Sequence, residues 1–399
     1  FKEDMKILLS SGAVSMKKEL YEYFDYDEDT VSLPGFIRSR SKIKEEAFTE
    51  LMKMMNKTYP CDKTYKGYRL LAVDGSELAI STDENDAQTI YGNQNGAYNA
   101  FHLNCLYDIL CRRYIDNIIQ PKRKEDEKKA MWTLAERYKG DKAIFIADRG
   151  YETFNNFEHL KKTGHKFLIR VKDIDSGTSL LKSFKSLPKD GEFDENVHIV
   201  FTNRQTKFIM NSPEIYKKIM TNQRFDFLDK GNHFYDADYR VVRIRIDGKD
   251  EEYESLITNL DRDEFPKEDI QKLYKLRWNI EVSYRHLKYS VDLSALHSRR
   301  RDFIRQEIWA RLVMFNISMI IIDYVQDRKL EKKKRDLEYK ANITMAIFFT
   351  KRYMITRKGG DPPDLECLIA KEILPVRDGR HYSRNVRPQG YISFGYRFN

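Results

Sequence analysis

The chain has 399 residues, enough for two or three domains and at least one large core. Lysine and arginine exceed the acidic residues by nine, which favours a polyanionic partner such as a nucleic acid. The longest apolar run, 313–322, is interrupted by Asn316 and Ser318 and is about half as long as a bilayer span, so we expect no membrane partner.

The chain has four cysteines, and no two of them form a CxxC pair. They are Cys61, Cys105, Cys111 and Cys367. Their scattered spacing predicts neither a disulfide framework nor a zinc cluster. It therefore favours a reducing compartment, the cytoplasm.

Residues 1–65 are predicted to be mostly helical. A basic cluster within them makes this region a candidate for DNA binding, and it consists of Arg38, Arg40, Lys42 and Lys44. The pattern changes after Tyr68. The short apolar run 70–73 ends in Asp74-Gly75, which predicts a buried strand followed by a turn.

Alternating strands and helices are predicted over the next hundred residues. The predicted elements are strands at 101–109 and 113–119, a helix at 124–138, a strand at 143–147, a helix at 152–163 and a strand at 166–171. This order favours an α/β fold with a mixed sheet and helices on its faces. Asp74 and Asp148 would follow buried strands, at the strand ends where open α/β sheets bind their ligands.

The stretch 172–260 is too long for a loop in a compact domain, and its runs at 198–202, 239–246 and 253–260 resemble strands. We interpret it as a β-rich insertion. In the second run, Arg243 and Arg245 alternate with apolar residues. These arginines either contact DNA or lie on a solvated outer face, and the pattern leaves both interpretations open.

Residues 266–291 predict one strong helix. At about 100° per residue, four side chains fall within an arc of roughly 60° beside an apolar stripe, namely Tyr274, Arg277, Glu281 and Lys288. In isolation, Arg277 and Glu281 could be a plain surface ion pair, since they are four residues apart. Their occurrence together with two aspartates at strand ends favours a functional site.

These motifs resemble the bacterial insertion-sequence transposases of the IS-four type. The segment 71–76 (Leu-Ala-Val-Asp-Gly-Ser) resembles the family's first catalytic aspartate, and 146–151 (Ile-Ala-Asp-Arg-Gly-Tyr) its second. The spacing of Tyr274, Arg277, Glu281 and Lys288 resembles its Tyr-Arg-Glu-Lys signature. The resemblance covers about 66–300.

The resemblance implies a domain organisation. It implies an RNase H-like catalytic core at 66–171 and 261–300, interrupted by the β-rich insertion at 172–260. Beyond the resemblance, the residues themselves predict a helical C-terminal region with a basic tail at 301–399. The family also implies cut-and-paste transposition and dimeric synapsis of two transposon ends that carry terminal inverted repeats.

The resemblance assigns catalysis and metal binding to Asp74, Asp148 and Glu281. Two Mg²⁺ ions, or Mn²⁺ in their place, would be held by these acids, with Asp74 bridging both ions. Three clustered carboxylates repel one another without a cation, so we expect a poorly formed site in its absence. For each aspartate taken singly, an ordinary turn residue after a strand is the alternative.

The other residues of the signature are predicted to contact DNA. Arg277 and Lys288 would neutralise phosphates, and Tyr274 would donate a hydrogen bond to one. Arg149 is a further phosphate contact or the ion-pair partner of a nearby carboxylate. Members of this group can flip a base out of the helix, and Tyr253 or Trp278 is a candidate platform for it. The alternative is that these aromatic rings belong to the core.

Basic runs lie outside the catalytic segments. Arg299 and Arg300 follow the signature helix and are candidate DNA contacts. The run 332–335 is mixed with acids and favours a solvated helix face. The tail contributes four more candidates for backbone contact, which are Arg377, Arg380, Arg384 and Arg387. The apolar stretch 308–324 predicts a buried helix and is a candidate neighbour of a dimer contact.

We therefore predict a Mg²⁺-dependent DNA transposase that acts on double-stranded DNA as a homodimer in the cytoplasm, on the bacterial nucleoid. No GxxxxGK[ST] loop is present, so no nucleotide cofactor is expected. Two alternatives stand beside this prediction. One is an RNase H-like nuclease that does not join strands, and the other is a catalytically silent DNA-binding derivative of a transposase.

Overall fold

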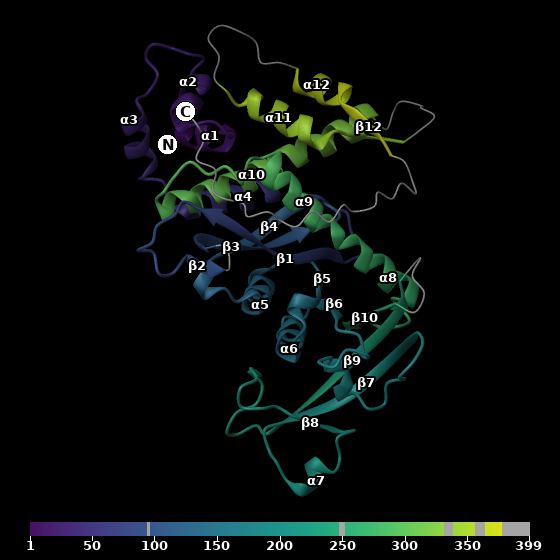
Figure 1. Cartoon of the computed structure of the whole chain (residues 1–399). Helices are drawn as coiled ribbons and strands as arrows, with labels where there is room; N and C mark the ends of the chain where they lie inside the picture. The colour runs from purple at the N-terminus through teal and green to yellow at the C-terminus, as the bar shows by residue number, and fades with distance from the viewer. Residues whose placement is uncertain (94–95, 247–251, 331–337, 356–363, 377–399) are drawn as a thin grey trace.

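A ten-stranded sheet with helices on both faces forms the centre of the molecule in the computed structural model, which describes residues 1–93, 96–246, 252–330, 338–355 and 364–376 (Figure 1). This mixed α/β architecture confirms the fold class expected from the sequence. The strands of the sheet are β1 (Arg69–Ile80), β2 (Ile90–Asn93), β3 (Gly96–Asp108), β4 (Arg113–Pro121), β5 (Ala143–Ala147), β6 (Lys166–Val171), β7 (Phe193–Thr202), β8 (Tyr216–Lys218), β9 (Phe234–Arg245) and β10 (Tyr253–Thr258).

The helices precede, interrupt and follow this sheet along the chain. Four of them lead into it, namely α1 (Lys2–Ser10), α2 (Met16–Tyr23), α3 (Leu33–Arg40) and α4 (Glu45–Thr58). Those within it are α5 (Glu127–Arg137), α6 (Phe154–Lys162) and α7 (Lys207–Met210), with short 3₁₀ turns η1 (Lys122–Lys124), η2 (Arg149–Tyr151) and η3 (Leu180–Ser183). Those after it are α8 (Lys267–Leu276), α9 (Trp278–Tyr289), α10 (Arg301–Val325), the π-turn η4 (Gln326–Leu330), α11 (Ile343–Tyr353) and α12 (Leu365–Lys371), with a small hairpin of β11 (Tyr339–Ala341) and β12 (Ile373–Pro375).

The sheet combines an antiparallel half with a parallel centre. Its order is β2-β3-β1-β5-β6-β10-β9-β7-β8, and β4 also pairs with β3. β1, β5 and β6 are mutually parallel. β5 is a fully buried five-residue apolar strand, as expected for a central strand that is covered by helices on both faces.

β1 is longer than the sequence predicts, because it does not turn at Asp74-Gly75. Residues 71–80 pair continuously with 99–108 of β3. This antiparallel ladder satisfies the backbone groups that a turn would have redirected. Asp74 therefore lies within a strand, at the point where β1 stops pairing with β5, since that parallel pairing ends at Ala72 and Ile146.

Two hydrophobic cores cover the two faces of the sheet. Leu70 and Ala72 of β1 face the core shared with α8, α9, α10 and the N-terminal helices. Leu71 and Val73 face the core shared with α5 and α6. Figure 1 shows α9 and α10 on one side of the sheet and α5 and α6 on the other. Elements on both faces therefore approach the end of the β1–β5 pairing.

The β-rich stretch 172–260 extends the same sheet, since β10 pairs with β6 and β9 with β10. Within it, Arg243 lies neither on a solvated face nor in a position to contact DNA. Its side chain is 2% exposed and forms ion pairs with Asp173 (2.8 Å) and Asp175 (2.6 Å). Both interpretations of this arginine from the strand pattern are therefore wrong, whereas Arg245 is exposed.

The predicted single helix at 266–291 is two helices, α8 and α9, that meet at Arg277. The backbone N–H of Arg277 donates to the carbonyl of Tyr274, and that of Ile280 donates to the carbonyl of Arg277. These bonds span three residues and tighten the helix locally. The angular positions predicted from an uninterrupted helix therefore shift across the junction.

The N-terminal residues are helical, as predicted, and α1 and α4 pack against α10. Within the basic cluster of this region, Arg40 is buried and forms an ion pair of 3.1 Å with Glu307 of α10. It is therefore unavailable to DNA, while Arg38, Lys42 and Lys44 are exposed. The stretch 301–328 is long and apolar enough to cross a membrane, but 72% of its most apolar window is buried, as in the core helix of a soluble protein.

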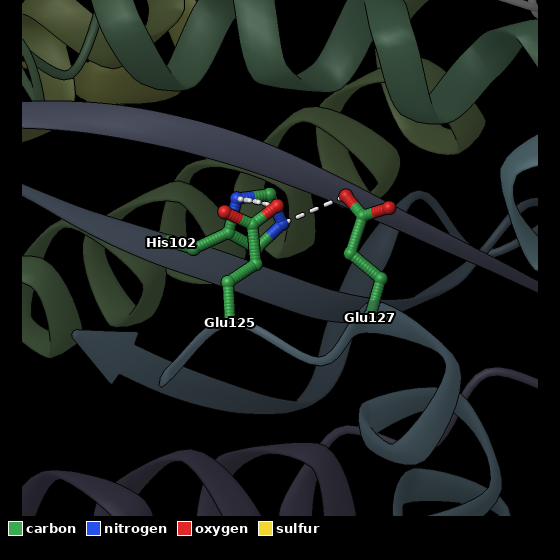
Figure 2. A group of neighbouring side chains, drawn as sticks. All are labelled: His102, Glu125 and Glu127. Atoms are coloured by element: carbon green, nitrogen blue, oxygen red, sulfur yellow. Dashed lines mark ion pairs between the residues drawn. The ribbon is translucent and has the colours of Figure 1, made fainter. Parts of the chain in front are cut away.

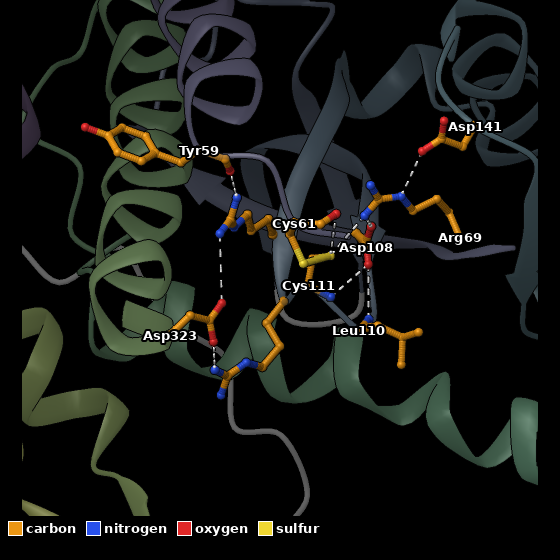
Figure 3. Close-up of a disulfide and its surroundings, with 10 residues drawn as sticks. Tyr59, Cys61, Arg69, Asp108, Leu110, Cys111, Asp141 and Asp323 are labelled. Carbon is orange, nitrogen blue, oxygen red and sulfur yellow. Dashed lines mark hydrogen bonds and ion pairs between the residues drawn. A yellow bond between two sulfur atoms is a disulfide. The ribbon is translucent and has the colours of Figure 1, made fainter. Parts of the chain in front are cut away.

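A disulfide joins Cys61 to Cys111, which the scattered cysteine spacing did not predict (Figure 3). The bond connects the segment after α4 with the turn between β3 and β4, across a sequence separation of 50. Nearby, Arg69 bridges Asp108 and Asp141, and Arg113 donates to the backbone carbonyl of Tyr59. Because no local motif brings the two cysteines together, only the packing of α4 on the sheet reveals the pair. The expected cytoplasmic location stays a prediction, and the cysteines no longer support it.

Candidate active site

Asp74 and Asp148 occupy matching positions on adjacent parallel strands. Each lies two residues beyond the last paired couple, Ala72 and Ile146. A local backbone N–H orients each carboxylate, since Gly75 donates to Asp74 Oδ1 at 2.9 Å and Gly150 to Asp148 Oδ1 at 2.8 Å. The sheet therefore presents the two acids together at the end of the β1–β5 pairing.

Glu281 reaches the site from α9, on one face of the sheet. Its Oε1 accepts a hydrogen bond of 2.7 Å from Arg277, whose side chain is 10% exposed. The pair is therefore not the plain surface pair of the alternative interpretation. The guanidinium adds a buried positive charge to a group of carboxylates, which reduces their mutual repulsion.

The pKa of Asp74 is raised by burial and by the nearby carboxylates. Burial raises the pKa of Asp74 to about 7, and the negative charges of Asp148 and Glu281 add to the rise, while Gly75 and Arg277 oppose it. Even so, the ligand atoms of the three acids do not all come within 4.8 Å of one another in the described chain.

Two side chains of α9 tie the helix to β1. The Tyr284 hydroxyl donates to the backbone carbonyl of Asp74 at 2.8 Å. Lys288 Nζ donates to the carbonyl of Glu77 at 3.5 Å, and burial lowers the pKa of this lysine. The sequence did not indicate this role for Tyr284, because its partner is a backbone group far away along the chain.

The other predicted DNA contacts of the signature differ in accessibility. Tyr274 is buried, and its hydroxyl has no hydrogen-bond partner among the described residues. Arg149 is exposed in η2, directly after Asp148, and its side chain makes no hydrogen bond or ion pair within the described part of the chain. Trp278 is partly exposed at the start of α9. Arg149 and Trp278 are therefore open to solvent beside the acids, whereas Tyr274 is not.

Tyr253 and Trp278 come from different faces of the sheet. Tyr253 alternates with Ile257, whose side chain lies in the core of α5 and α6. The guanidinium of Arg243 covers its ring at 4.0 Å. At least one ring face is therefore occupied by the protein itself.

The basic residues Arg299 and Arg300 after α9 are both exposed. Arg300 forms an ion pair of 2.6 Å with Asp302 and lies over the ring of Phe303. Arg299 is exposed, and its carbonyl accepts from Ser81. The run 332–335 and the four tail arginines Arg377, Arg380, Arg384 and Arg387 lie outside the described residues.

A second group of possible metal ligands, absent from the sequence prediction, lies on the α5 side of the sheet. It consists of His102, Glu125 and Glu127, whose ligand atoms lie within 4.8 Å of one another (Figure 2). His102 is on β3 and Glu127 begins α5, so the spacing along the chain resembles no metal motif. Only Glu125 and Glu127 are neighbours in sequence, and two acids at a helix start are ordinary N-terminal residues.

The donor chemistry of the acids suits a hard divalent cation. Asp74, Asp148 and Glu281 offer carboxylate oxygens alone, the ligands that Mg²⁺ prefers. The raised pKa of Asp74 means that this cluster is stabilised by taking up a positive charge, either a proton or a metal ion. The fold and site define an α/β protein with a carboxylate centre of the kind that binds divalent metal ions.

Comparison with known proteins places the chain in a family. The model of the transposase DDE domain matches residues 65–317, well over half of the chain. The chain therefore belongs to the DDE transposase family. The matched segment contains both aspartates, Glu281 and the insertion between them, so the resemblance to insertion-sequence transposases of the IS-four type is confirmed.

Individual relatives are distant. The chain is 26% identical over 142 residues to transposase InsG of insertion sequence element IS4 from Escherichia coli strain K12, a match that covers 33% of this chain and 31% of that protein. It is 21% identical over 266 residues to the transposase of IS231E from Bacillus thuringiensis subsp. finitimus, covering 59% and 53%. The matches thus span about a third and about half of these relatives' own lengths.

A solved structure also resembles the chain in outline. It is the piggyBac transposase synaptic complex with hairpin DNA, with a TM-score of 0.44 and 9% sequence identity, covering 89% of this chain and 71% of that one.

Proposed function

We propose that this chain is a DNA transposase that cleaves at the terminal inverted repeats of its transposon and joins the freed 3′-hydroxyl to target DNA. The observation that carries the proposal is the matched register of Asp74 and Asp148 on adjacent parallel strands, completed by Glu281 of α9. Membership of the DDE transposase family supports the same assignment.

Asp74, Asp148 and Glu281 would hold two Mg²⁺ ions, for which Mn²⁺ would substitute. When bound, such ions supply Lewis-acid stabilisation of a phosphodiester under attack and lower the pKa of the attacking group. Gly75 and Gly150 fix the orientation of the two aspartates through their backbone N–H groups. Arg277 holds Glu281 in place and reduces the repulsion among the acids.

The proposed DNA contacts are the positively charged side chains that lie near these acids. Arg149 lies one residue beyond Asp148 and is exposed, so it suits a phosphate next to the scissile bond. Lys288 is half-buried beside β1, and burial disfavours its positive charge. A DNA phosphate next to its ammonium group would stabilise that charge. We further propose that two copies of the chain synapse two double-stranded transposon ends, on the nucleoid in the bacterial cytoplasm.

A cleavage assay on DNA that carries the element's own ends tests this function. Wild-type protein and the Asp148→Ala variant are compared in Mg²⁺ and in EDTA, with the exposed Asp190→Ala as a matched control. We expect metal-dependent cuts at the element boundary with wild type and with the control, and a loss of about 1000-fold with Asp148→Ala.

Each alternative function has its own outcome in this assay. Cuts without joined products, when target DNA is supplied, would identify a nuclease that lacks strand transfer. Specific binding of the ends without cleavage in Mg²⁺ or Mn²⁺ would identify a silent DNA-binding derivative.

A further inference from the structure

In the group of His102, Glu125 and Glu127, the two carboxylates differ in how many partners they have. His102 is buried between the two carboxylates, with Nε2 at 2.9 Å from Glu127 Oε1 and Nδ1 at 3.4 Å from Glu125 Oε1 (Figure 2). Lys122 neutralises Glu125 at 2.6 Å and also pairs with Glu77 at 2.8 Å. Glu125 is therefore fully engaged. The Oε2 of Glu127 makes no hydrogen bond or ion pair among the described residues.

Two glycines show where the carboxylate of Glu127 lies. A Cβ atom placed on Gly75 would meet His102 Nε2 at 2.3 Å and Glu127 Oε1 at 2.5 Å. No real side chain tolerates such distances, so the absence of a side chain at Gly75 makes room for the pair. Gly75 directly follows Asp74. The His102–Glu127 pair is therefore packed against the backbone that carries the first catalytic aspartate.

The second glycine relates Glu127 to Asp148. A Cβ atom placed on Gly150 would lie 3.1 Å from Asp148 Oδ1 and 3.7 Å from Glu127 Oε2. The two carboxylates thus face the same small space, and the oxygen that Glu127 turns towards it is the one without a protein partner. Burial raises the pKa of Tyr151, and the negative charges of Asp74, Glu127 and Asp148 add to the rise.

We propose that Glu127 is a fourth carboxylate of the catalytic centre, a ligand through Oε2 for a divalent ion bound at Asp74 and Asp148, and that His102 is its positioning residue. This inference rests on the proposed function. α9 brings Glu281 to the centre from one face of the sheet, and α5 brings Glu127 from the other. The imidazole Nε2 lies 2.9 Å from Oε1, and Oε2 lies on the side of Gly150 and Asp148.

A separate metal site made of His102, Glu125 and Glu127 fits the same residues less well. A metal ion there would have to displace Lys122 from Glu125 and to enter between an imidazole and two carboxylates that already pair with one another. A separate site would also not explain why Glu127 Oε2 lies near the space beside Asp148.

The test measures Mn²⁺ binding to the full chain without DNA, by isothermal titration calorimetry, together with Mn²⁺-dependent cleavage of the transposon ends. The variants are Glu127→Gln, Glu125→Gln and Asp148→Asn, with Glu136→Gln as the matched control, an exposed glutamate on the same helix α5. We expect Glu127→Gln to remain folded, as circular dichroism would show, but to weaken Mn²⁺ binding about 10–100-fold and to slow cleavage.

The other variants separate the possible explanations. Glu136→Gln should bind and cleave like wild type, and Glu125→Gln should have a smaller effect than Glu127→Gln. His102→Asn should weaken Mn²⁺ binding in the wild-type background but add little to Glu127→Gln, as a positioning residue does. Glu127→Asp keeps the charge, so partial recovery of Mn²⁺ affinity would support a ligand role over a purely structural one.

Three results would overturn the inference. The first is wild-type Mn²⁺ affinity in folded Glu127→Gln. The second is equal losses in Glu125→Gln and Glu127→Gln that are independent of Asp148→Asn, which would indicate a separate metal site. The third is unchanged Mn²⁺ binding in Asp148→Asn together with lost binding in Glu127→Gln. If instead wild type binds Mn²⁺ at Asp148 and Glu127 but never cuts the ends, the transposase proposal fails and the ligand assignment survives.

Discussion

The hydroxyl of Tyr284 donates a hydrogen bond of 2.8 Å to the backbone carbonyl of Asp74, and it lies 3.3 Å from the carbonyl of Leu103. The helix that carries Glu281 is thereby joined to the strand that carries the first aspartate. The side chain of Tyr284 is buried, so its hydroxyl relies on these protein acceptors. The bond therefore helps to hold Asp74 and Glu281 in one register.

Replacing this tyrosine tests its role. We expect Tyr284→Phe to lower the free energy of unfolding by about 1–3 kcal/mol, because a buried acceptor loses its donor. Cleavage should also slow, because α9 is no longer held to β1 at this point. Urea denaturation and the cleavage assay measure the two effects. The exposed Tyr289→Phe on the same helix is the control, and equal behaviour of the two variants would refute the anchoring role.

Asp74 should make the metal-free protein less stable as the pH rises. Its pKa in the folded state is raised from 3.8 to about 7, so the native state holds this proton more tightly than the unfolded state. The resulting stability is fully present below pH 3.8 and is lost as the pH rises through about 7.

Asp74→Asn removes this ionisation, so in EDTA it should raise the unfolding midpoint by several degrees at pH 8 and by less at pH 5. Thermal unfolding at the two pH values measures the difference. A midpoint shift that is independent of pH would contradict the assignment. Cleavage should be abolished in this variant even though it is more stable.

Divalent ions should stabilise the folded chain through the same acids. An ion present at a hundredfold excess over its dissociation constant adds about 2.7 kcal/mol for each site. Mg²⁺ should therefore raise the unfolding midpoint of wild type relative to EDTA, and the shift should shrink in Asp148→Asn and Glu281→Gln. Equal shifts in wild type and in both variants would show that the ions bind elsewhere.

A buried ion-pair network joins the N-terminal helices to the core helix α10. Glu307 accepts from Arg40 at 3.1 Å and from the backbone N–H of His297 at 2.6 Å. Glu307→Gln should lower the free energy of unfolding by about 3–5 kcal/mol, because it leaves a buried guanidinium without its counter-charge. Chemical denaturation measures this, with the exposed Glu50→Gln of α4 as the control. A change below 1 kcal/mol would contradict the network's role.

The pH dependence of this network has a defined sign. Burial opposes ionisation of Glu307, but His297 and Arg40 hold the pKa of Glu307 at about 2, below its ordinary 4.5. The contribution of Glu307 to stability is therefore present above pH 4.5 and is lost as the pH falls towards 2. The pKa of His297 is raised, so its own contribution is lost as the pH rises through that value.

The disulfide should contribute strongly to stability under oxidising conditions. Cys111→Ser or a reductant removes a link between residues 50 positions apart, which should cost about 2–4 kcal/mol of unfolding free energy. Urea denaturation with and without dithiothreitol measures the effect. A wild-type protein that is indifferent to the reductant would show that the bond is not formed in solution.

The sequence alone determined the elements whose signals are local. The strand β5 and the strand β6 lie where their apolar runs predict, because a central strand is buried on both faces and shows as a continuous apolar run. Asp148 and Glu281 stand out through local patterns of the same kind, since one follows such a run and the other lies four residues after Arg277 in a helical stretch. Their catalytic role stays a prediction.

The tertiary structure decided whatever depends on partners far apart in the chain. β1 continues through Asp74-Gly75 because β3 pairs with it, and Arg243 is buried because Asp173 and Asp175 neutralise it. The joining of Cys61 to Cys111 and the approach of Glu127 to Gly75 likewise need the packed sheet. Periodicity reports which face of an element is buried, but hydrogen bonds and ion pairs between distant segments are set only when those segments pack together.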